Sequence, residues 1–161
     1  MADVIARLAK PQVVLGATGL TAVLLRHHPG AAASLLVSVP LTVAGSRVLK
    51  RLDPKQRPRL LDRHPRESFP SSHSAAITAY ALALIDSFAA WWALPAAAAA
   101  IATVNVSRIK DREHWLSDVL SGDLIGVIGA LAGKLAARWI ARAADRARSR
   151  DVEAARRRKR P

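Results

Sequence analysis

Apolar residues gather into long segments that almost entirely lack Asp, Glu, Lys and Arg. The five segments are residues 11–25, 27–46, 68–85, 87–107 and 119–140. Only the last is interrupted by charge, at three positions. A helix needs about 20 mostly apolar residues to cross a bilayer, so two to four segments are long enough and the others would span with tilt or snorkelling ends. The pattern predicts an all-α fold, a membrane-embedded helical bundle of about five transmembrane helices.

The boundaries of these helices follow from prolines and from the ends of the apolar segments. The predicted helices cover residues 11–26, 31–50, 72–91, 94–108 and 116–141. Three X-Pro pairs between Asp53 and Pro65 place a loop after the second helix. Four glycines between Gly122 and Gly133 include two Gly-xxx-Gly spacings, which let helices approach closely in lipid.

The chain is interpreted as one membrane-embedded domain, residues 1–142, followed by a basic tail, residues 143–161. Its 161 residues are 51% hydrophobic and 4% aromatic, with a formal net charge of +13. Such a charge is typical of chains that meet nucleic acid, an anionic membrane surface or anionic substrates. The tail has no interleaved aromatic residues and no nucleic-acid fold motif is present, which argues against nucleic acid and for a membrane anchor. The tail is predicted to be a frayed helix or a disordered arm. No cysteine is present, so the chain has no disulfide framework and no thiolate metal site.

Residues able to handle a phosphate occur in three short stretches. The stretches are Lys50 with Arg57-Pro58, then Pro70-Ser71-Ser72-His73, then Ser107-Arg108 with His114 and Asp118. A tetrahedral dianion needs fixed cationic donors, a nucleophile and an acid behind the leaving group. Each stretch falls at the end of a predicted helix, and alternating crossings would bring all of them to one side of the membrane.

The pattern Lys-x6-Arg-Pro, Pro-Ser-x-His, Ser-Arg-x5-His-x3-Asp resembles the signature of the type 2 phosphatidic acid phosphatase / vanadium haloperoxidase superfamily. All three parts occur in order and with the family's internal spacing, within a motif core of about residues 31–135. The one departure is Ser72, where the family usually has Gly, and Ser still exposes its backbone N–H. The chain most resembles the small bacterial branch of membrane lipid phosphatases.

The chemistry of these residues and the resemblance imply the same roles. His114 is the candidate nucleophile that forms a phosphohistidine, His73 is the general acid, and Asp118 orients the His114 ring. The phosphate-binding candidates are Lys50, Arg57, Ser71, Ser72 and Arg108. For the serines, simple capping of the following helix is a compatible interpretation. The mechanism that the resemblance implies needs no metal and no cofactor.

These roles favour a metal-independent phosphatase that hydrolyses a phosphomonoester or diphosphate of a membrane lipid. Candidate substrates are phosphatidic acid, phosphatidylglycerol phosphate, and polyprenyl phosphate or diphosphate. Alternatives on the same fold are a vanadate-dependent haloperoxidase, with vanadate on His114, and an isoprenoid-diphosphate-processing enzyme. A third alternative is a non-enzymatic protein whose basic tail binds anionic lipid. The oligomeric state is left open.

The expected location is the bacterial inner membrane. Lys and Arg are nearly balanced between the two predicted sides, so the positive-inside rule does not decide the orientation. The resemblance implies an active site outside the cytoplasm. Asp86 and Asp123 lie inside apolar segments, where a carboxylate is costly in lipid, and both are expected to face the bundle.

Overall fold

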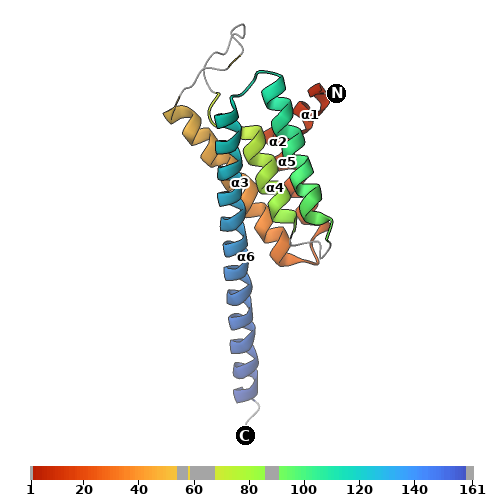
Figure 1. Ribbon diagram of the computed structural model, residues 1–161. Helices are drawn as coiled ribbons and strands as arrows, with labels where there is room; N and C mark the ends of the chain where they lie inside the picture. The colour runs from red at the N-terminus through yellow and green to blue at the C-terminus, as the bar shows by residue number, and fades with distance from the viewer. Residues whose placement is uncertain (1, 54–57, 59–67, 86–90, 159–161) are drawn as a thin grey trace.

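The protein is a bundle of α-helices with one helix that extends far beyond the others (Figure 1). The computed structural model describes residues 2–53, 58, 68–85 and 91–158. The helices are α1 (Ala2–Leu8), α2 (Pro11–Leu24), α3 (Pro29–Leu52), α4 (Ser72–Ile85), α5 (Ala93–Lys110) and α6 (Leu116–Arg158). The predicted all-α fold is confirmed.

Helices α2 to α6 correspond to the five predicted helices. Pro11 and Pro29 each stand at the start of a helix, where the missing N–H costs nothing and the fixed φ suits the first turn. α1 is an additional helix, which the apolar pattern does not predict because its segment carries Asp3 and Arg7. The described part of the third predicted helix ends at Ile85. Residues 86–90 are outside the described residues, and Trp91 lies in a turn.

The basic tail differs from its predicted frayed or disordered state, because α6 continues as one helix to Arg158 (Figure 1). After Gly133 the chain contains neither Gly nor Pro until Pro161. Alanine and arginine, which dominate this stretch, are among the strongest helix formers. The bundle supplies the nucleus, and each further residue then adds a hydrogen bond at little cost.

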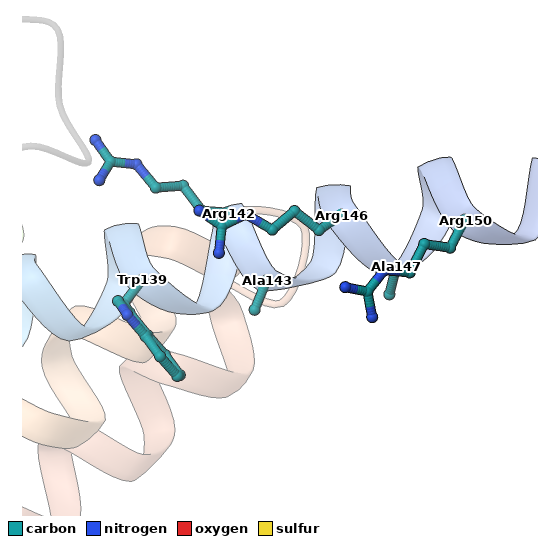
Figure 2. A pocket seen from close by; sticks show the side chains of 6 residues that line it. All are labelled: Trp139, Arg142, Ala143, Arg146, Ala147 and Arg150. Carbon is teal, nitrogen blue, oxygen red and sulfur yellow. The ribbon is translucent and has the colours of Figure 1, made fainter.

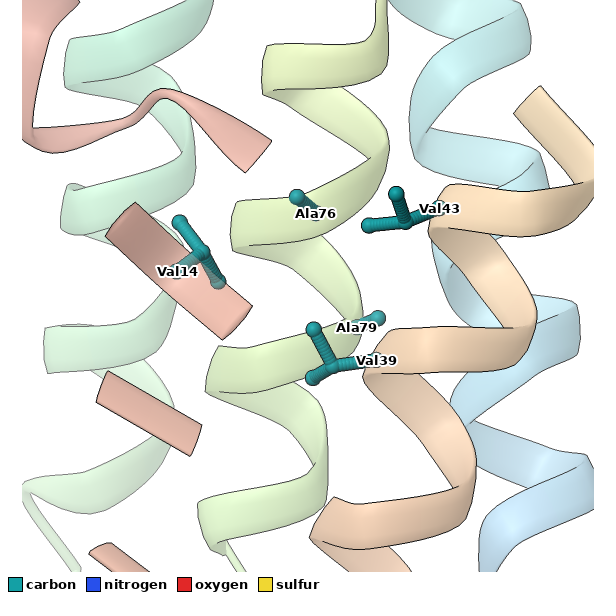
Figure 3. Close-up of a cluster of buried hydrophobic side chains, with 5 residues drawn as sticks. All are labelled: Val14, Val39, Val43, Ala76 and Ala79. Carbon is teal, nitrogen blue, oxygen red and sulfur yellow. The ribbon is translucent and has the colours of Figure 1, made fainter. Parts of the chain in front are cut away.

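The interior of the bundle is built from small and hydroxyl-bearing residues. α6 packs mainly against α3 and α4. A Cβ atom on Gly129 would collide with the Thr42 hydroxyl, and one on Gly133 would collide with the Ser38 hydroxyl. The two backbones therefore approach too closely for any larger residue, as the glycine spacing predicts. A small apolar cluster of Val14, Val39, Val43, Ala76 and Ala79 joins α2, α3 and α4 (Figure 3).

The large apolar side chains point outward instead. On α6, side chains spaced along one face are more than half exposed, namely Leu120, Leu124, Ile128, Leu131 and Leu135. A small-residue interior with an apolar exterior is the arrangement that lipid favours, and soluble proteins rarely expose so much contiguous apolar surface. α3 and α6 are long and apolar enough to cross a membrane, whereas α2 and α4 are apolar but have 14 residues each. The number of spanning helices therefore stays a prediction.

One end of the bundle gathers four helix termini. α3 and α5 finish at this end, and α4 and α6 begin there (Figure 1). The three phosphate-handling stretches lie at or beside these termini. The topology expected from alternating helix crossings is thus present in the described helices.

Candidate active site

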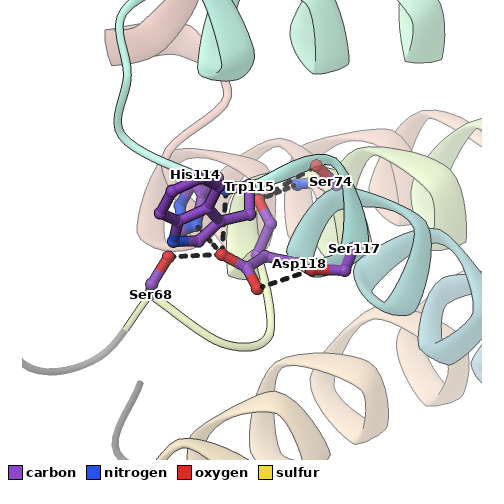
Figure 4. A network of polar contacts seen from close by, with 7 residues as sticks. Ser68, Ser74, His114, Trp115, Ser117 and Asp118 are labelled. Carbon is purple, nitrogen blue, oxygen red and sulfur yellow. Dashed lines mark hydrogen bonds and ion pairs between the residues drawn. The ribbon is translucent and has the colours of Figure 1, made fainter. Parts of the chain in front are cut away.

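Two hydrogen bonds attach the loop before α4 to the first turn of α6. The backbone N–H of Ser71 donates to the backbone carbonyl of Asp118 at 2.9 Å. The Ser68 hydroxyl donates to the Asp118 carboxylate (Figure 4). A Cβ atom on Gly122, one turn further along α6, would collide with the Ser71 carbonyl. The second and third stretches, far apart in sequence, therefore meet through direct backbone contact.

Asp118 is fully buried and lies at the centre of this polar network. Its Oδ2 accepts the Ser68 hydroxyl and also the backbone N–H of Trp115, at 3.0 Å. The hydroxyl of Ser117 lies 3.5 Å from Oδ1. A buried carboxylate is costly unless donors surround it, and these donors come from the loop before α4 and from the start of α6.

His114 is 3% exposed, and its Nδ1 lies 3.9 Å from Oδ2 of Asp118 (Figure 4). The predicted pairing four residues apart is thus present as a close contact. The His114 backbone N–H donates to the carbonyl of Arg108 at 3.3 Å. Between the two residues the chain turns sharply, and Arg112 takes a left-handed conformation with φ of 54°. Because Nδ1 is turned toward Asp118, Nε2 is the ring nitrogen that could act as a nucleophile.

Arg108 supplies a buried cation at the end of α5. Its side chain is 8% exposed and makes an ion pair of 2.9 Å with Asp111. The Nε–H of Arg108 is buried and has no hydrogen-bond partner in the part of the chain that the structure describes. A buried donor without a partner is costly. The Nε–H of the guanidinium is therefore positioned to donate to an oxyanion. The backbone carbonyl of Arg108 holds the backbone of His114 in place.

The start of α4 places the serines and His73. Ser71 is fully buried, and its hydroxyl accepts the Ser74 hydroxyl at 3.0 Å and the Ser74 backbone N–H at 3.4 Å. Ser71 therefore caps the helix, and both its N–H and its hydroxyl are engaged inside the protein. Ser72 and His73 lie in the first helical turn and are partly exposed, where helix N–H groups lack intrahelical acceptors. A phosphate contact from Ser71 stays a prediction, and the geometry suits Ser72 better.

The first stretch is described only in part. Lys50 lies in the last turn of α3 and is partly buried. That turn is at the end of the bundle where α6 begins (Figure 1). Arg57 lies outside the described residues, so its predicted phosphate contact has no structural account.

Ser68 and the partners of Asp123 have little signal in the sequence. Ser68 is a loop residue outside any helical period, and only its contact with Asp118 shows its importance. A second polar cluster lies one to two turns deeper, where Asp123 accepts the Thr78 hydroxyl at 2.8 Å and the Asn105 amide at 2.6 Å. Asp123 therefore faces the bundle as expected, and it links α6 to α4 and α5. Asp86 lies outside the described residues.

An apolar groove runs along α4 and α5, beginning one helical turn after His73. It is lined by Ile77, Tyr80, Leu84 and Trp92 together with alanines of both helices. Ile77 lies four residues after His73, so both belong to one face of α4. The Tyr80 hydroxyl is paired with Thr21 of α2 at 2.7 Å. The lining is almost wholly apolar, which suits a hydrocarbon chain.

The fold and the site together define a helical membrane bundle with a buried histidine, carboxylate and arginine at one end. The PAP2 superfamily profile matches residues 31–143. The match covers more than half of the chain, and the protein belongs to the PAP2 superfamily, whose members share a helical membrane fold. Membership implies phosphatase-type activity on phosphate esters. No curated protein and no solved structure matches the chain.

Proposed function

We propose that this protein hydrolyses the phosphate group of a membrane lipid through a phosphohistidine intermediate, without a metal ion. The observation that carries the proposal concerns Arg108. Its buried guanidinium has an Nε–H without a partner in the described residues, and its backbone carbonyl accepts the backbone N–H of His114. A buried cation beside a buried histidine supplies charge stabilisation and a nucleophile at the same place.

In the first half-reaction, Nε2 of His114 attacks phosphorus and forms a P–N bond. The bond from phosphorus to the lipid oxygen breaks, its electron pair stays on that oxygen, and His73 donates the proton that neutralises it. Arg108, Lys50, Arg57 and the N–H groups at Ser72 hold the non-bridging oxygens. Asp118, with Oδ2 3.9 Å from Nδ1, stabilises the positive charge that the ring acquires.

In the second half-reaction, water attacks the phosphohistidine. The P–N bond breaks, His114 recovers its electron pair, and inorganic phosphate forms. His73, which lost its proton to the first leaving group, accepts the proton of the attacking water. The enzyme thus returns to its starting state without any other reactant.

The groove beside His73 supports a lipid as the substrate. Its residues Ile77, Tyr80 and Leu84 follow the same face of α4 that presents His73. A lipid whose phosphate sits against Arg108 would lay its chain along this groove, where the apolar lining packs against the chain. Phosphatidic acid, phosphatidylglycerol phosphate and polyprenyl phosphates or diphosphates all fit this description.

The first experiment measures phosphate release by purified protein in detergent with EDTA present, from a panel of these lipid phosphates. The wild type is expected to release phosphate and to form an acid-labile phosphoprotein with a labelled substrate. His114→Ala is expected to lose both properties. His27→Ala is the matched control, because His27 is exposed between α2 and α3. Release that survives in His114→Ala, or no release from any lipid by folded wild-type protein, would overturn the proposal.

We also infer that the site faces away from the cytoplasm of a bacterium, in its inner membrane. The chain has no native cysteine, so a single Arg148→Cys change creates a clean probe on the exposed extension of α6. A membrane-impermeant maleimide is expected to label it only after the inner membrane is opened. Labelling of intact spheroplasts would reverse the orientation and leave the chemistry as proposed.

A further inference from the structure

A second groove lies at the end of the bundle opposite the candidate active site. It has a volume of about 230 Å³ and is formed by the first turns of α3, the end of α4 and the middle of α6. Gly30, Ala31 and Ser34 line it from α3, and Lys134 and Arg138 line it from α6. Alanines of α4 and α6 form the remaining wall. None of these residues has a part in the proposed hydrolysis.

The position of the groove follows from the length of α6. Asp118 and Lys134 are separated by 16 residues on one continuous helix, and Asp118 and Arg138 by 20. At 1.5 Å per residue the separations are about 24 Å and about 30 Å, and the hydrocarbon core of a bilayer is about 30 Å thick. Trp139, beside Arg138, is 73% exposed, as an interfacial aromatic anchor would be. With the active site at one membrane surface, the groove lies at the other.

The groove concentrates positive potential from two sources. Lys134 and Arg138 contribute formal charges. The start of α3 contributes its dipole, because Ala32 makes the first helical bond, to the His28 carbonyl, and the first turn contains no acidic residue. A helix N-terminus with two cations opposite it is suited to a phosphate.

Ser34 gives an independent indication of a ligand. It lines the groove and is 5% exposed, and its hydroxyl has no hydrogen-bond partner among the described residues. Ser38, one turn later on the same face, donates to the Ser34 carbonyl at 2.7 Å. Buried hydroxyls are normally paired. An external acceptor in the groove would satisfy the Ser34 hydroxyl.

We propose that this groove binds the phosphate of an anionic phospholipid from the membrane leaflet opposite the active site. Lys134 and Arg138 neutralise the phosphate charge, while Ser34 and the N–H groups of Gly30 and Ala31, which precede the first helical hydrogen bond of α3, donate to its oxygens. The alanine wall contacts the glycerol and upper acyl region. The bound lipid joins α3, α4 and α6 at the end of the bundle that lacks the hydrogen-bonded network around Asp118.

The exposed face of the α6 extension offers no comparable site. A shallow depression there is lined by Trp139, Arg142, Arg146 and Arg150 with the alanines between them (Figure 2). All of its lining residues belong to α6, so no second element encloses a ligand. Its arginines nevertheless provide a matched control, because they carry the same charge outside the groove.

The test compares lipid retention by full-length protein purified in detergent and exposed to micelles containing phosphatidylglycerol or phosphatidylcholine. Native mass spectrometry measures the lipid retained, and a melting curve measures stabilisation. The wild type is expected to retain phosphatidylglycerol selectively and to melt at a higher temperature with it. Lys134→Gln/Arg138→Gln is expected to weaken retention at least about tenfold, and Arg146→Gln/Arg150→Gln is expected to leave it unchanged.

Equal retention by the two double variants would overturn the proposal, since overall charge would then explain the binding. Complete displacement of the lipid by inorganic phosphate would also overturn it, because the site would then bind a free anion. If Lys134→Gln/Arg138→Gln fails to fold, Gly30→Leu tests whether the lipid binds in the groove. A Cβ atom at Gly30 meets nothing within 4 Å, so this variant fills the groove and keeps both cations. Retention lost in Gly30→Leu supports the groove, and retention unchanged contradicts it.

Discussion

The backbone N–H of Ser71 bonds the backbone carbonyl of Asp118 at 2.9 Å, and this contact joins the starts of α4 and α6. α4 carries His73 in its first turn, and α6 carries Asp118 in its first turn. The relative position of the proposed acid and the orienting carboxylate is therefore fixed by main-chain atoms. Because both atoms belong to the main chain, truncating the side chain of Ser68 or Arg108 removes neither of them, so such variants separate chemistry from assembly.

Replacing Ser68 by Ala removes one donor from the buried Asp118 carboxylate. The loss of a hydrogen bond to a charged group costs about 1.5–3 kcal/mol. If about 1.4 kcal/mol of this is lost in the transition state, kcat falls about tenfold, with little change in KM. Steady-state phosphate release measures both constants. Ser117→Ala is the control, because its hydroxyl lies 3.5 Å from the same carboxylate and is exposed. Equal effects of the two substitutions would contradict a special role for Ser68.

Replacing Arg108 by Gln removes the buried cation at the proposed phosphate site. We expect kcat to fall about 10²–10³-fold, the usual loss when one donor to a developing oxyanion is removed. Arg108→Lys should recover little of it, because an ammonium group lacks the planar fork and cannot replace Nε. Inhibition by vanadate, a phosphate analogue, should weaken in parallel. A variant with full vanadate affinity would place Arg108 outside the anion site.

Replacing Gly122 by Ala tests the close approach of α6 and the loop before α4. The new Cβ would collide with the Ser71 carbonyl, whose residue also bonds Asp118. Overpacking of this kind costs about 1–3 kcal/mol, so the melting temperature and the activity should fall together. Gly16→Ala is the matched control, since its Cβ meets nothing within 4 Å. There the helix preference of Ala over Gly should raise stability by up to about 1 kcal/mol. Unchanged melting temperature and activity in Gly122→Ala would show that α6 and the loop before α4 can move apart without cost.

The sequence predicts the fold where periodicity and composition agree. Four of the helices follow from segments without charge and a fifth from a segment with only three charges, and the close packing of α6 follows from the glycines between Gly122 and Gly133. α1 escapes prediction because its short segment mixes charged and apolar residues. The length of α6 is not predicted, because the high charge of the tail is typical of a solvated, disordered arm. Its Ala and Arg content nevertheless favours a helix, and the helix continues to Arg158.

The sequence predicts that His114 and Asp118 lie close together, and it predicts less of how the surrounding loop is arranged. The spacing of His114 and Asp118 places them on neighbouring turns, and the structure puts Nδ1 and Oδ2 3.9 Å apart. Spacing alone does not show that Ser71 uses its N–H and hydroxyl inside the protein, nor that Ser68 donates to Asp118. Both facts depend on the path of a loop, which has no period to reveal it.

Replacing Asp123 by Ala removes the acceptor that links α6 to Thr78 of α4 and Asn105 of α5. Few contacts otherwise join α5 and α6, and Asn105 lies three residues before Arg108. The bundle should lose about 1–2 kcal/mol, the range for hydrogen bonds between membrane helices, and kcat should fall as Arg108 shifts. Asp123→Asn keeps one acceptor oxygen, so its stability and its kcat should lie between those of Asp123→Ala and the wild type. Asp145→Ala, on the exposed extension, is the control for loss of charge. Full activity in Asp123→Ala would show that α5 is positioned by other contacts.

Replacing Ala96 by Phe places a large side chain in the apolar groove that we assign to the lipid chain. Ala96 is exposed and lines the groove, so the helix can accept the larger residue without overpacking the core. We expect kcat/KM for a long-chain lipid phosphate to fall about tenfold, which corresponds to about 1.4 kcal/mol of lost chain binding. Hydrolysis of a short, water-soluble phosphate ester should be unchanged, because that substrate never enters the groove. Ala98→Phe, two residues along and therefore on another face of α5, should leave both activities intact. If Ala96→Phe affects the long and the short substrate equally, the groove acts on the chemistry and does not hold the lipid chain.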